Sequence, residues 1–359
     1  MAVLVSPANT NSDAGARTGR ARGKRSGSAQ KGANAAPPKP ASGRAGGVGR
    51  EKVSEIQRAR ILAAMQEVAS ERGAGNVTVA HVVARSGVSR RTFYELFEDR
   101  EACFLAAFDD AVGQIAARVV PAYEAQRASH SRNGWRDGIR AGLAALLDFL
   151  DEQPQAGRLC VVESLAAGPL ALERRARVAE VIKQALDEGH GEAKGSREPP
   201  PLTAEGVIGA VSSVLHARLT ATAQGSFAEL LGPLVGMIVL PYEGAAAATR
   251  EIERPRAPRP KRPPSQGGDP LRELDMRLTY RTVRVLLAVA QSPGASNRAL
   301  ADAAGVSDQG QISKLLSRLK ALGLIENVGR GPVKGEPNAW RLTSKGQQVG
   351  EAIDVQIRP

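Results

Sequence analysis

The alternation of apolar and polar positions predicts that most of the chain is helical. Before Gly73, apolar residues recur at three- and four-residue steps, at Ile56, Ala59, Leu62, Met65 and Ala69. This spacing predicts an amphipathic helix that ends near Gly73. Similar spacing continues to about residue 250 without the two-residue alternation of strands, so the first part of the chain is expected to be an all-helical block.

A helix-turn-helix follows the first helix. Thr78 is suited to cap a short helix that runs to about Arg85, and Ser89 is suited to cap a second one. Between them, Gly87 supplies the positive φ angle that a tight turn requires. In the second helix, residues 90–97, the apolar spacing turns Phe93 and Leu96 inward. It leaves the polar side chains outside, which are those of Arg90, Arg91, Thr92 and Tyr94.

Six further helices are expected before residue 250, in one domain. They cover residues 104 to about 126, 135–152, 155–167, 169–188, 203–223 and 227 to about 250. The last two contain many small residues, which allow two helices to approach closely. The small residues are Gly206, Gly209, Ala210, Ser213, Gly232 and Gly236.

A second helix-turn-helix is expected near the C-terminus. After an apolar helix that starts near Leu271, Ser296 is suited to cap a short helix that ends at Ala304. Gly305 then provides the turn, and Ser307 is expected to cap a longer helix over residues 308–322. Residues 323–328 and 339–343 look like two short strands around a glycine-rich loop, which is the pattern of a hairpin wing.

Changes in composition mark the domain boundaries. Residues 1–50 are rich in Gly, Ala, Ser, Pro and Arg and show no apolar periodicity, so no folded core is expected there. Residues 251–270 are rich in proline, which favours an extended spacer. The expected organisation is a disordered basic tail (1–50), a helix-turn-helix domain (51–103), a helical domain (104–250), a linker (251–270) and a small α+β domain (271–359). The fold class is therefore mainly α.

The net charge of +12 is unevenly distributed along the chain. Residues 1–50 carry nine Lys and Arg against one acidic residue, and residues 271–359 carry thirteen against eight. Such a tail either attracts nucleic-acid phosphates without reading sequence or simply keeps the protein soluble. The longest apolar run, Leu230 to Leu240, is interrupted by Pro233 and too short to span a bilayer, so no membrane association is expected.

The sequence gives no support for an enzyme. The glycine clusters lack the strand, helix and lysine of a phosphate-binding loop, and no serine lies in a nucleophile elbow. The four histidines are not spaced like metal ligands, so we expect no metal and no cofactor. Cys103 and Cys160 lie in helical patterns and are expected in the core, which suits a reducing cytoplasm.

The stretch from Val77 to Glu101, VTVAHVVARSGVSRRTFYELFEDRE, resembles the DNA-binding head of TetR-family repressors. The resemblance extends over roughly residues 55–110 and departs from the family at Arg100, where lysine is usual. It implies phosphate contacts from Thr78, Tyr94 and Arg100. It also implies a major-groove helix that Ser89 caps and from which Arg90, Arg91 and Thr92 read bases.

Residues 275–350 resemble the winged helix-turn-helix of MarR-type regulators. This resemblance implies that polar side chains of the second recognition helix reach the major groove and that basic residues of the wing reach a phosphate or the minor groove. The residues concerned are Gln309, Gln311, Ser313, Lys314 and Arg318 in the helix, and Arg330 and Lys334 in the wing. Many winged helices instead dimerise or bind protein, and Asp308 would oppose a phosphate at the start of the helix, so these alternatives stay open beside DNA contact.

Together these patterns predict a sequence-specific transcriptional regulator, which in the family's usual case is a repressor. It is expected in the cytoplasm, associated with the nucleoid when bound to DNA. Its partners are expected to be double-stranded DNA and a second copy bound through the last two helices of residues 203–250. The family resemblance also implies a small-molecule effector, for which no binding residue is evident. The alternative is a nonspecific nucleic-acid-binding or scaffold protein whose winged helix contacts other proteins.

Overall fold

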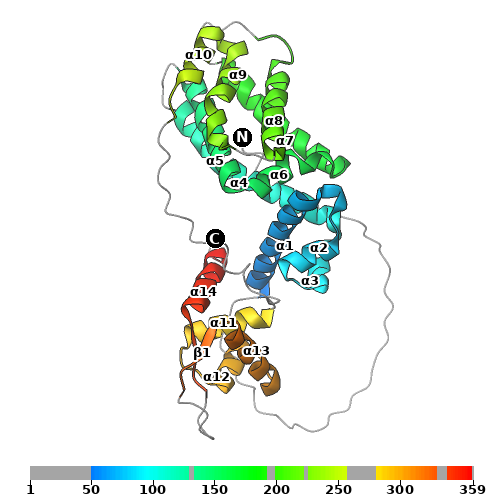
Figure 1. The fold of residues 1–359 in the computed structure, drawn as a ribbon, viewed down its shortest axis with the longest axis vertical. Helices are drawn as coiled ribbons and strands as arrows, with labels where there is room; N and C mark the ends of the chain where they lie inside the picture. The colour runs from blue at the N-terminus through cyan, green and yellow to red at the C-terminus, as the bar shows by residue number, and fades with distance from the viewer. Residues whose placement is uncertain are drawn as a thin grey trace, which may run out of the picture.

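The structure is a computed structural model that describes residues 50–128, 133–191, 199–221, 225–256, 280–329 and 338–357. The tail, most of the linker, and the predicted wing residues Arg330 and Lys334 lie outside the described residues. Figure 1 shows three parts along the long axis, which we call the middle domain, the head and the C-terminal domain. Among the described residues, no helix has the length and apolar character needed to cross a membrane.

The head consists of three helices and the start of a fourth. Its elements are α1 (Arg50–Arg72), the short 3-10 turn η2 (Ala74–Asn76), α2 (Val79–Ser86) and α3 (Arg90–Leu96). The turn between α2 and α3 is made by Gly87, whose φ of 65° lies in the left-handed region that favours glycine. The predicted helix-turn-helix is therefore present.

The middle domain is entirely helical where the structure describes it. Its helices are α4 (Arg100–Arg127), α5 (Gly134–Glu152), α6 (Pro154–Val161), α7 (Pro169–Gly191), α8 (Thr203–Thr220), α9 (Leu231–Glu243) and α10 (Ala245–Glu253), with 3-10 turns η3 (Glu163–Leu165) and η4 (Phe227–Leu230). Two predicted helices are shorter than expected: α6 gives way to η3, and α8 ends at Thr220.

The helix predicted over residues 227–250 is wrong as a single element. Gly244, at φ 82°, separates α9 from α10, and α10 folds back against α9. At Gly232, a β-carbon would lie 2.8 Å from the carbonyl oxygen of Ile252, so the glycine permits this close approach. The small residues of α9 thus serve packing within one chain, which apolar spacing alone could not reveal.

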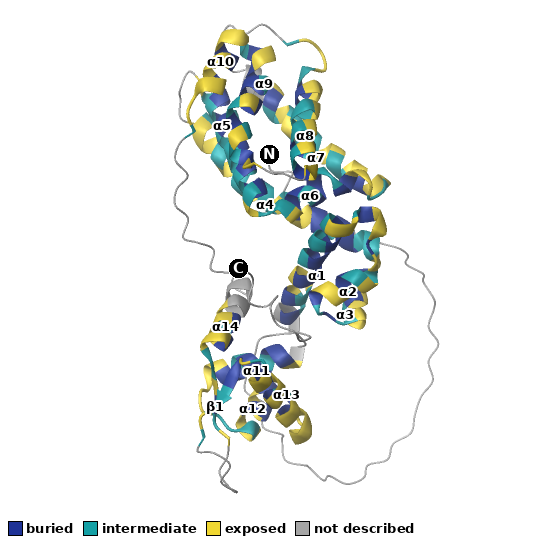
Figure 2. Ribbon diagram, in the orientation of Figure 1, coloured by how far each residue is buried: buried dark blue, intermediate teal, exposed yellow. Residues whose placement is uncertain are grey.

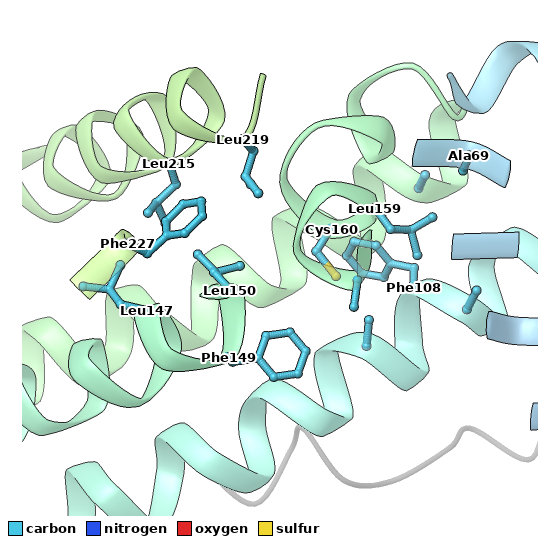
Figure 3. Packing of buried hydrophobic residues seen from close by; sticks show 14 of the residues in the cluster. Ala69, Phe108, Leu147, Phe149, Leu150, Leu159, Cys160, Leu215, Leu219 and Phe227 are labelled. Atoms are coloured by element: carbon cyan, nitrogen blue, oxygen red, sulfur yellow. The ribbon is translucent and has the colours of Figure 1, made fainter. Parts of the chain in front are cut away.

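The head and the middle domain share one hydrophobic core. It extends from Met65 and Ala69 of α1 through Phe108 of α4 to Leu150 of α5 and Leu219 of α8. Figure 3 shows the middle part of this core, in which the side chains of α4, α5, α6, α8 and η4 converge. Cys103 and Cys160 are buried, as expected, and burial raises the pKa of each thiol to about 12.

The C-terminal domain has the predicted α+β composition. It contains α11 (Tyr280–Gln291), α12 (Asn297–Ala304), α13 (Gln309–Ala321), strands β1 (Ile325–Asn327) and β2 (Trp340–Leu342), and α14 (Ser344–Ile357). The strands pair antiparallel, with Ile325 opposite Leu342. The sequence reasoning did not foresee α14, which packs against β2 where Gly346 leaves room for the Leu324 carbonyl.

The first turns of α1 belong to the core of the C-terminal domain. Val53 and Ile56 are each 1% exposed and cluster with apolar residues of α11, α12, α13 and α14. The apolar stripe predicted before Gly73 therefore serves two cores, since Ile56 is buried against the C-terminal domain, and Ala59 of the same stripe is exposed. Figure 2 shows the buried face of α1 continuing toward α11 at its lower end.

Candidate nucleic-acid interface

Side-chain caps fix both helices of the turn in the head. The Thr78 hydroxyl accepts a hydrogen bond from His81 N at 3.2 Å, and the Ser89 hydroxyl accepts one from Thr92 N at 3.0 Å. Both caps stand where the sequence predicts them. The Ser89 and Thr92 hydroxyls also form a hydrogen bond of 2.9 Å, which ties Thr92 to the cap. The Thr92 side chain is half-buried.

An aromatic anchor holds α3 against the rest of the head. Phe93 is fully buried, and its ring centre lies 5.7 Å from the ring centre of Phe97 and 5.5 Å from that of Tyr94. Arg58 of α1 places its guanidinium 5.1 Å from the Phe97 ring centre. With one side pinned by aromatic packing, the opposite side of α3 has a defined orientation.

The opposite side of α3 is basic and exposed. Arg91 has 90% of its side chain exposed and pairs with Glu95 one turn later at 2.9 Å. Arg90 is exposed with its guanidinium 6.0 Å from the Tyr94 ring centre, and Tyr94 itself is 49% exposed. Two exposed guanidiniums at the start of a helix are suited to guanine edges in a major groove.

Arg100 makes a contact within the protein. Its guanidinium donates a hydrogen bond to the carbonyl oxygen of Ala74 at 2.8 Å. The side chain is half-buried, and Asp99 caps the same helix by accepting from Ala102 N at 2.7 Å. Arg100 therefore fastens the start of α4 to η2, and its phosphate contact stays a prediction.

The second turn has the same backbone design and different polar chemistry. Ser296 caps α12, and Gly305 makes the turn at φ 63°. The cap of α13 is Asp308 and not Ser307 as predicted: one carboxylate oxygen accepts from Gly310 N at 2.7 Å and from Gln311 N at 3.1 Å. These backbone hydrogen bonds hold the pKa of Asp308 below its usual range.

All five residues predicted on the second recognition helix lie at the surface. Gln309, Gln311, Ser313, Lys314 and Arg318 are exposed. Two of them are already engaged inside the domain, since Gln311 accepts a hydrogen bond from Arg281 at 2.7 Å and Ser313 lies 3.2 Å from the Asn297 amide. The two cations of this face lie beyond the first turn of α13, whereas those of α3 lie in its first turn, and part of the α13 face is already committed to its own domain.

A buried carboxylate that the sequence reasoning missed joins the head to the middle domain. Glu163 of η3 accepts a hydrogen bond from Ala74 N of η2 at 2.9 Å and another from Arg158 of α6 at 3.1 Å. Arg158 also donates to the Leu219 carbonyl at the end of α8, at 3.0 Å. Because Glu163 and Ala74 are 89 positions apart, no local sequence pattern signals this contact.

Part of the head matches a known protein family. Residues 61–107 match the model of the family described as "Bacterial regulatory proteins, tetR family". Over these residues the head is similar to TetR-family regulators, and we call it the TetR-type head. The match begins inside α1 and ends inside α4, so this TetR-type head includes the capped turn and all of α3. A search of curated proteins finds no match to the chain.

Several solved structures resemble about half of this chain. A TetR family transcription regulator from Marinobacter aquaeolei VT8 is 19% identical, with a TM-score of 0.43 over 54% of this chain and 98% of that one. FadR from Bacillus subtilis, solved with stearoyl-CoA, is 14% identical, with a TM-score of 0.44 over 50% and 97%. NalD, the secondary repressor of the MexAB-OprM multidrug efflux pump in Pseudomonas aeruginosa, is 13% identical, with a TM-score of 0.42 over 53% and 96%.

Proposed function

We propose that this protein is a transcriptional regulator, acting as a repressor, that binds a specific DNA operator through α3 of its TetR-type head. The observation that carries the proposal is the exposed Arg90, Arg91 and Tyr94 face on a short helix that caps and aromatic packing hold in place. Arginine pairs with guanine edges, and tyrosine and Thr78 are suited to flanking phosphates. Such a regulator works on the nucleoid in the cytoplasm.

The proposed operator is a palindrome read by a homodimer. A twofold dimer places two recognition helices on half-sites about 34–36 Å apart, one turn of DNA. We propose that α8 contributes to the subunit contact, because β-carbons added at Gly206 and Gly209 would meet no described atom within 4 Å. On α9, Gly232 and Gly236 already face Ile252 of α10, so α9 offers less free surface than the sequence suggested.

We propose that an effector bound in the middle domain would act on the head through Glu163. Arg158 touches the end of α8 and holds Glu163, and Glu163 in turn holds the Ala74 peptide beside Arg100. A displacement of α6 or α8 would therefore pull on the turn that orients α2 and α3. Effector binding would favour a dimer whose heads no longer match the half-site spacing.

Selection of genomic DNA fragments by the full chain at near-physiological salt tests the proposal. We expect one enriched palindrome with the wild-type protein and its loss with an Arg90→Ala/Arg91→Ala variant. An Arg177→Ala variant, which removes an exposed charge from α7, is the matched control and should retain the palindrome. Binding without sequence preference and with a steep salt dependence would instead support a nonspecific nucleic-acid-binding protein.

A further inference from the structure

Helix α1 is shared between two hydrophobic cores. Val53 and Ile56 are buried among residues of the C-terminal domain, whereas Ile61, Leu62 and Met65 are buried in the core of the head and the middle domain. The TetR-family match begins at residue 61, so the first turns of α1 lie outside it. These turns form a docking segment, residues 53–56, on which α11 and α14 pack.

The connection between the two domains is short and stiff. Ile56 and Ile61 are five residues apart in one helix, or about 7.5 Å along its axis. Between Arg50 and Arg72 the helix contains neither glycine nor proline, the residues at which helices most often bend. Figure 1 shows α1 passing from the head directly to the C-terminal domain. The docked domain is therefore held at a fixed position and orientation relative to α3.

Docking leaves both recognition helices uncovered. With the C-terminal domain in place, the Arg91 side chain is still 90% exposed, and Lys314 and Arg318 of α13 are exposed as well. The sequence of residues 271–359 also carries a net positive charge, thirteen Lys and Arg against eight acidic residues. An arrangement that blocked DNA binding would cover α3, so the exposure favours a second contact with the same DNA.

We propose that the C-terminal domain reads DNA beside the half-site of its own head, at a spacing fixed by its seat on Val53 and Ile56. This inference rests on the proposed function of the head and extends it from one reader to two per subunit. Each half-site then has an outer element contacted by Gln309, Lys314 and Arg318. Two readers on one rigid body bind the composite site with higher affinity than either element alone, because the second contact is intramolecular.

Distances between spin labels test the docking without DNA. Labels attached through Ala59→Cys on α1 and Ser317→Cys on α13 lie at exposed positions. The native thiols, both buried with pKa values near 12, should stay unlabelled at neutral pH. In labelled chains diluted with an excess of unlabelled chain, so that distances within one subunit dominate, we expect a narrow distribution of the distance between the two labels, and a broad one after Ile56→Asp. A broad distribution before that substitution, or a narrow one after it, would overturn the docking.

DNA selection with the full chain then tests the second reader. The wild-type protein should enrich a palindrome with an outer element at one constant spacing from each half-site. In Val53→Asp/Ile56→Asp the palindrome should persist, while the outer element disappears or varies in spacing and affinity for the composite site falls about tenfold or more. Ala59→Asp adds a charge to an exposed position of the same helix and should behave like the wild type.

The outcomes separate this inference from the proposed function. A palindrome without any outer element in the wild type would overturn the second reader and leave the head's function standing. An outer element at unchanged spacing in the double variant would show that the seat on α1 does not set the spacing. The absence of any palindrome would overturn the proposed function itself. Ile56→Ala, a milder change, should show the same trend if the double variant unfolds its C-terminal domain.

Discussion

The two helix-turn-helix units of this chain have nearly the same backbone and different surfaces. Each turn uses a left-handed glycine, Gly87 at φ 65° and Gly305 at φ 63°, and each second helix begins with a side-chain cap. In the head the cap is the neutral Ser89 and the exposed face is basic. In the C-terminal domain the cap is a carboxylate, and the exposed face contains amides, a hydroxyl, a lysine and an arginine.

Turn geometry and DNA affinity are therefore separate properties. Backbone and cap place a helix, but the charge of its first turn decides how strongly phosphates and guanines attract it. We therefore expect the head to supply most of the binding free energy and the C-terminal domain to add a smaller, spacing-dependent part. Variants of the two recognition helices test this ranking, and variants of Glu163 and Asp308 test how each helix-turn-helix is held.

The largest effect is expected from the arginines of α3. Arg90→Ala/Arg91→Ala should weaken operator binding by about 100-fold, since each good contact to a base is worth about 1–3 kcal/mol. The melting temperature should barely change, because the Arg91 side chain is 90% exposed. Fluorescence anisotropy with the selected operator, beside thermal unfolding, measures both. Unchanged affinity would mean that α3 is not the reader, and the ranking would then reverse.

The next effect concerns how the head is held. Glu163→Gln keeps the shape of the side chain but removes its negative charge. That charge pairs with Arg158 and strengthens the hydrogen bond that Glu163 accepts from Ala74 N. We expect a loss of about 1–2 kcal/mol in the free energy of unfolding, a modest figure because Arg158 remains partly exposed. Urea unfolding followed by circular dichroism measures it. Glu173→Gln, at an exposed position of α7, should have no effect, and equal behaviour of the two variants would remove Glu163 from the connection.

A smaller effect is expected from α13. Lys314→Ala should reduce affinity a few-fold for every DNA sequence and lower the slope of log affinity against log salt by about one. Gln309→Ala should instead change the preference at the outer element. Salt titrations on operators with and without that element distinguish the two. If neither variant alters DNA binding, the C-terminal domain is a protein-interaction module and the comparison loses its second reader.

The smallest effect concerns the cap of α13. The pKa of Asp308 is lowered in the folded protein by hydrogen bonds from Gln311 N and Gly310 N, so its ionised form stabilises the fold above its unfolded pKa. This contribution is lost as the pH falls through the folded pKa. Asp308→Asn should therefore lower the melting temperature of the domain by a few degrees at pH 7 and by less at acidic pH. A difference that does not shrink on acidification would exclude this charge effect.

Local chemistry made much of the fold predictable. Caps and glycine turns located both helix-turn-helix units, and helical spacing located α4, α5 and α7 to within a few residues. Two features escaped because they depend on distant contacts. The break at Gly244 is stabilised by the packing of α10 on α9, and Ile56 has the right spacing for the head's core although its buried partners come after residue 280.

The candidate site shows the same limit. Exposure of Arg90, Arg91 and Tyr94 followed from helical periodicity, and Thr78 and Ser89 stand at the caps where they were expected. Helical periodicity could not predict the hydrogen bond of Arg100 within the protein, because its acceptor is the backbone carbonyl of Ala74, 26 positions away. The cap of α13 is Asp308, one residue after the predicted Ser307. Either side chain can cap a helix, so only the exact start of the helix distinguishes them.

A structure of the full chain bound to its selected operator would show whether α3 and α13 of each subunit contact the same DNA. We expect a twofold dimer with α3 of each subunit in successive major grooves, Arg90 and Arg91 at base edges, and α13 on the same DNA beyond each half-site. A complex in which α3 faces away from the DNA, or in which only the C-terminal domain touches it, would rule out α3 as the principal reader.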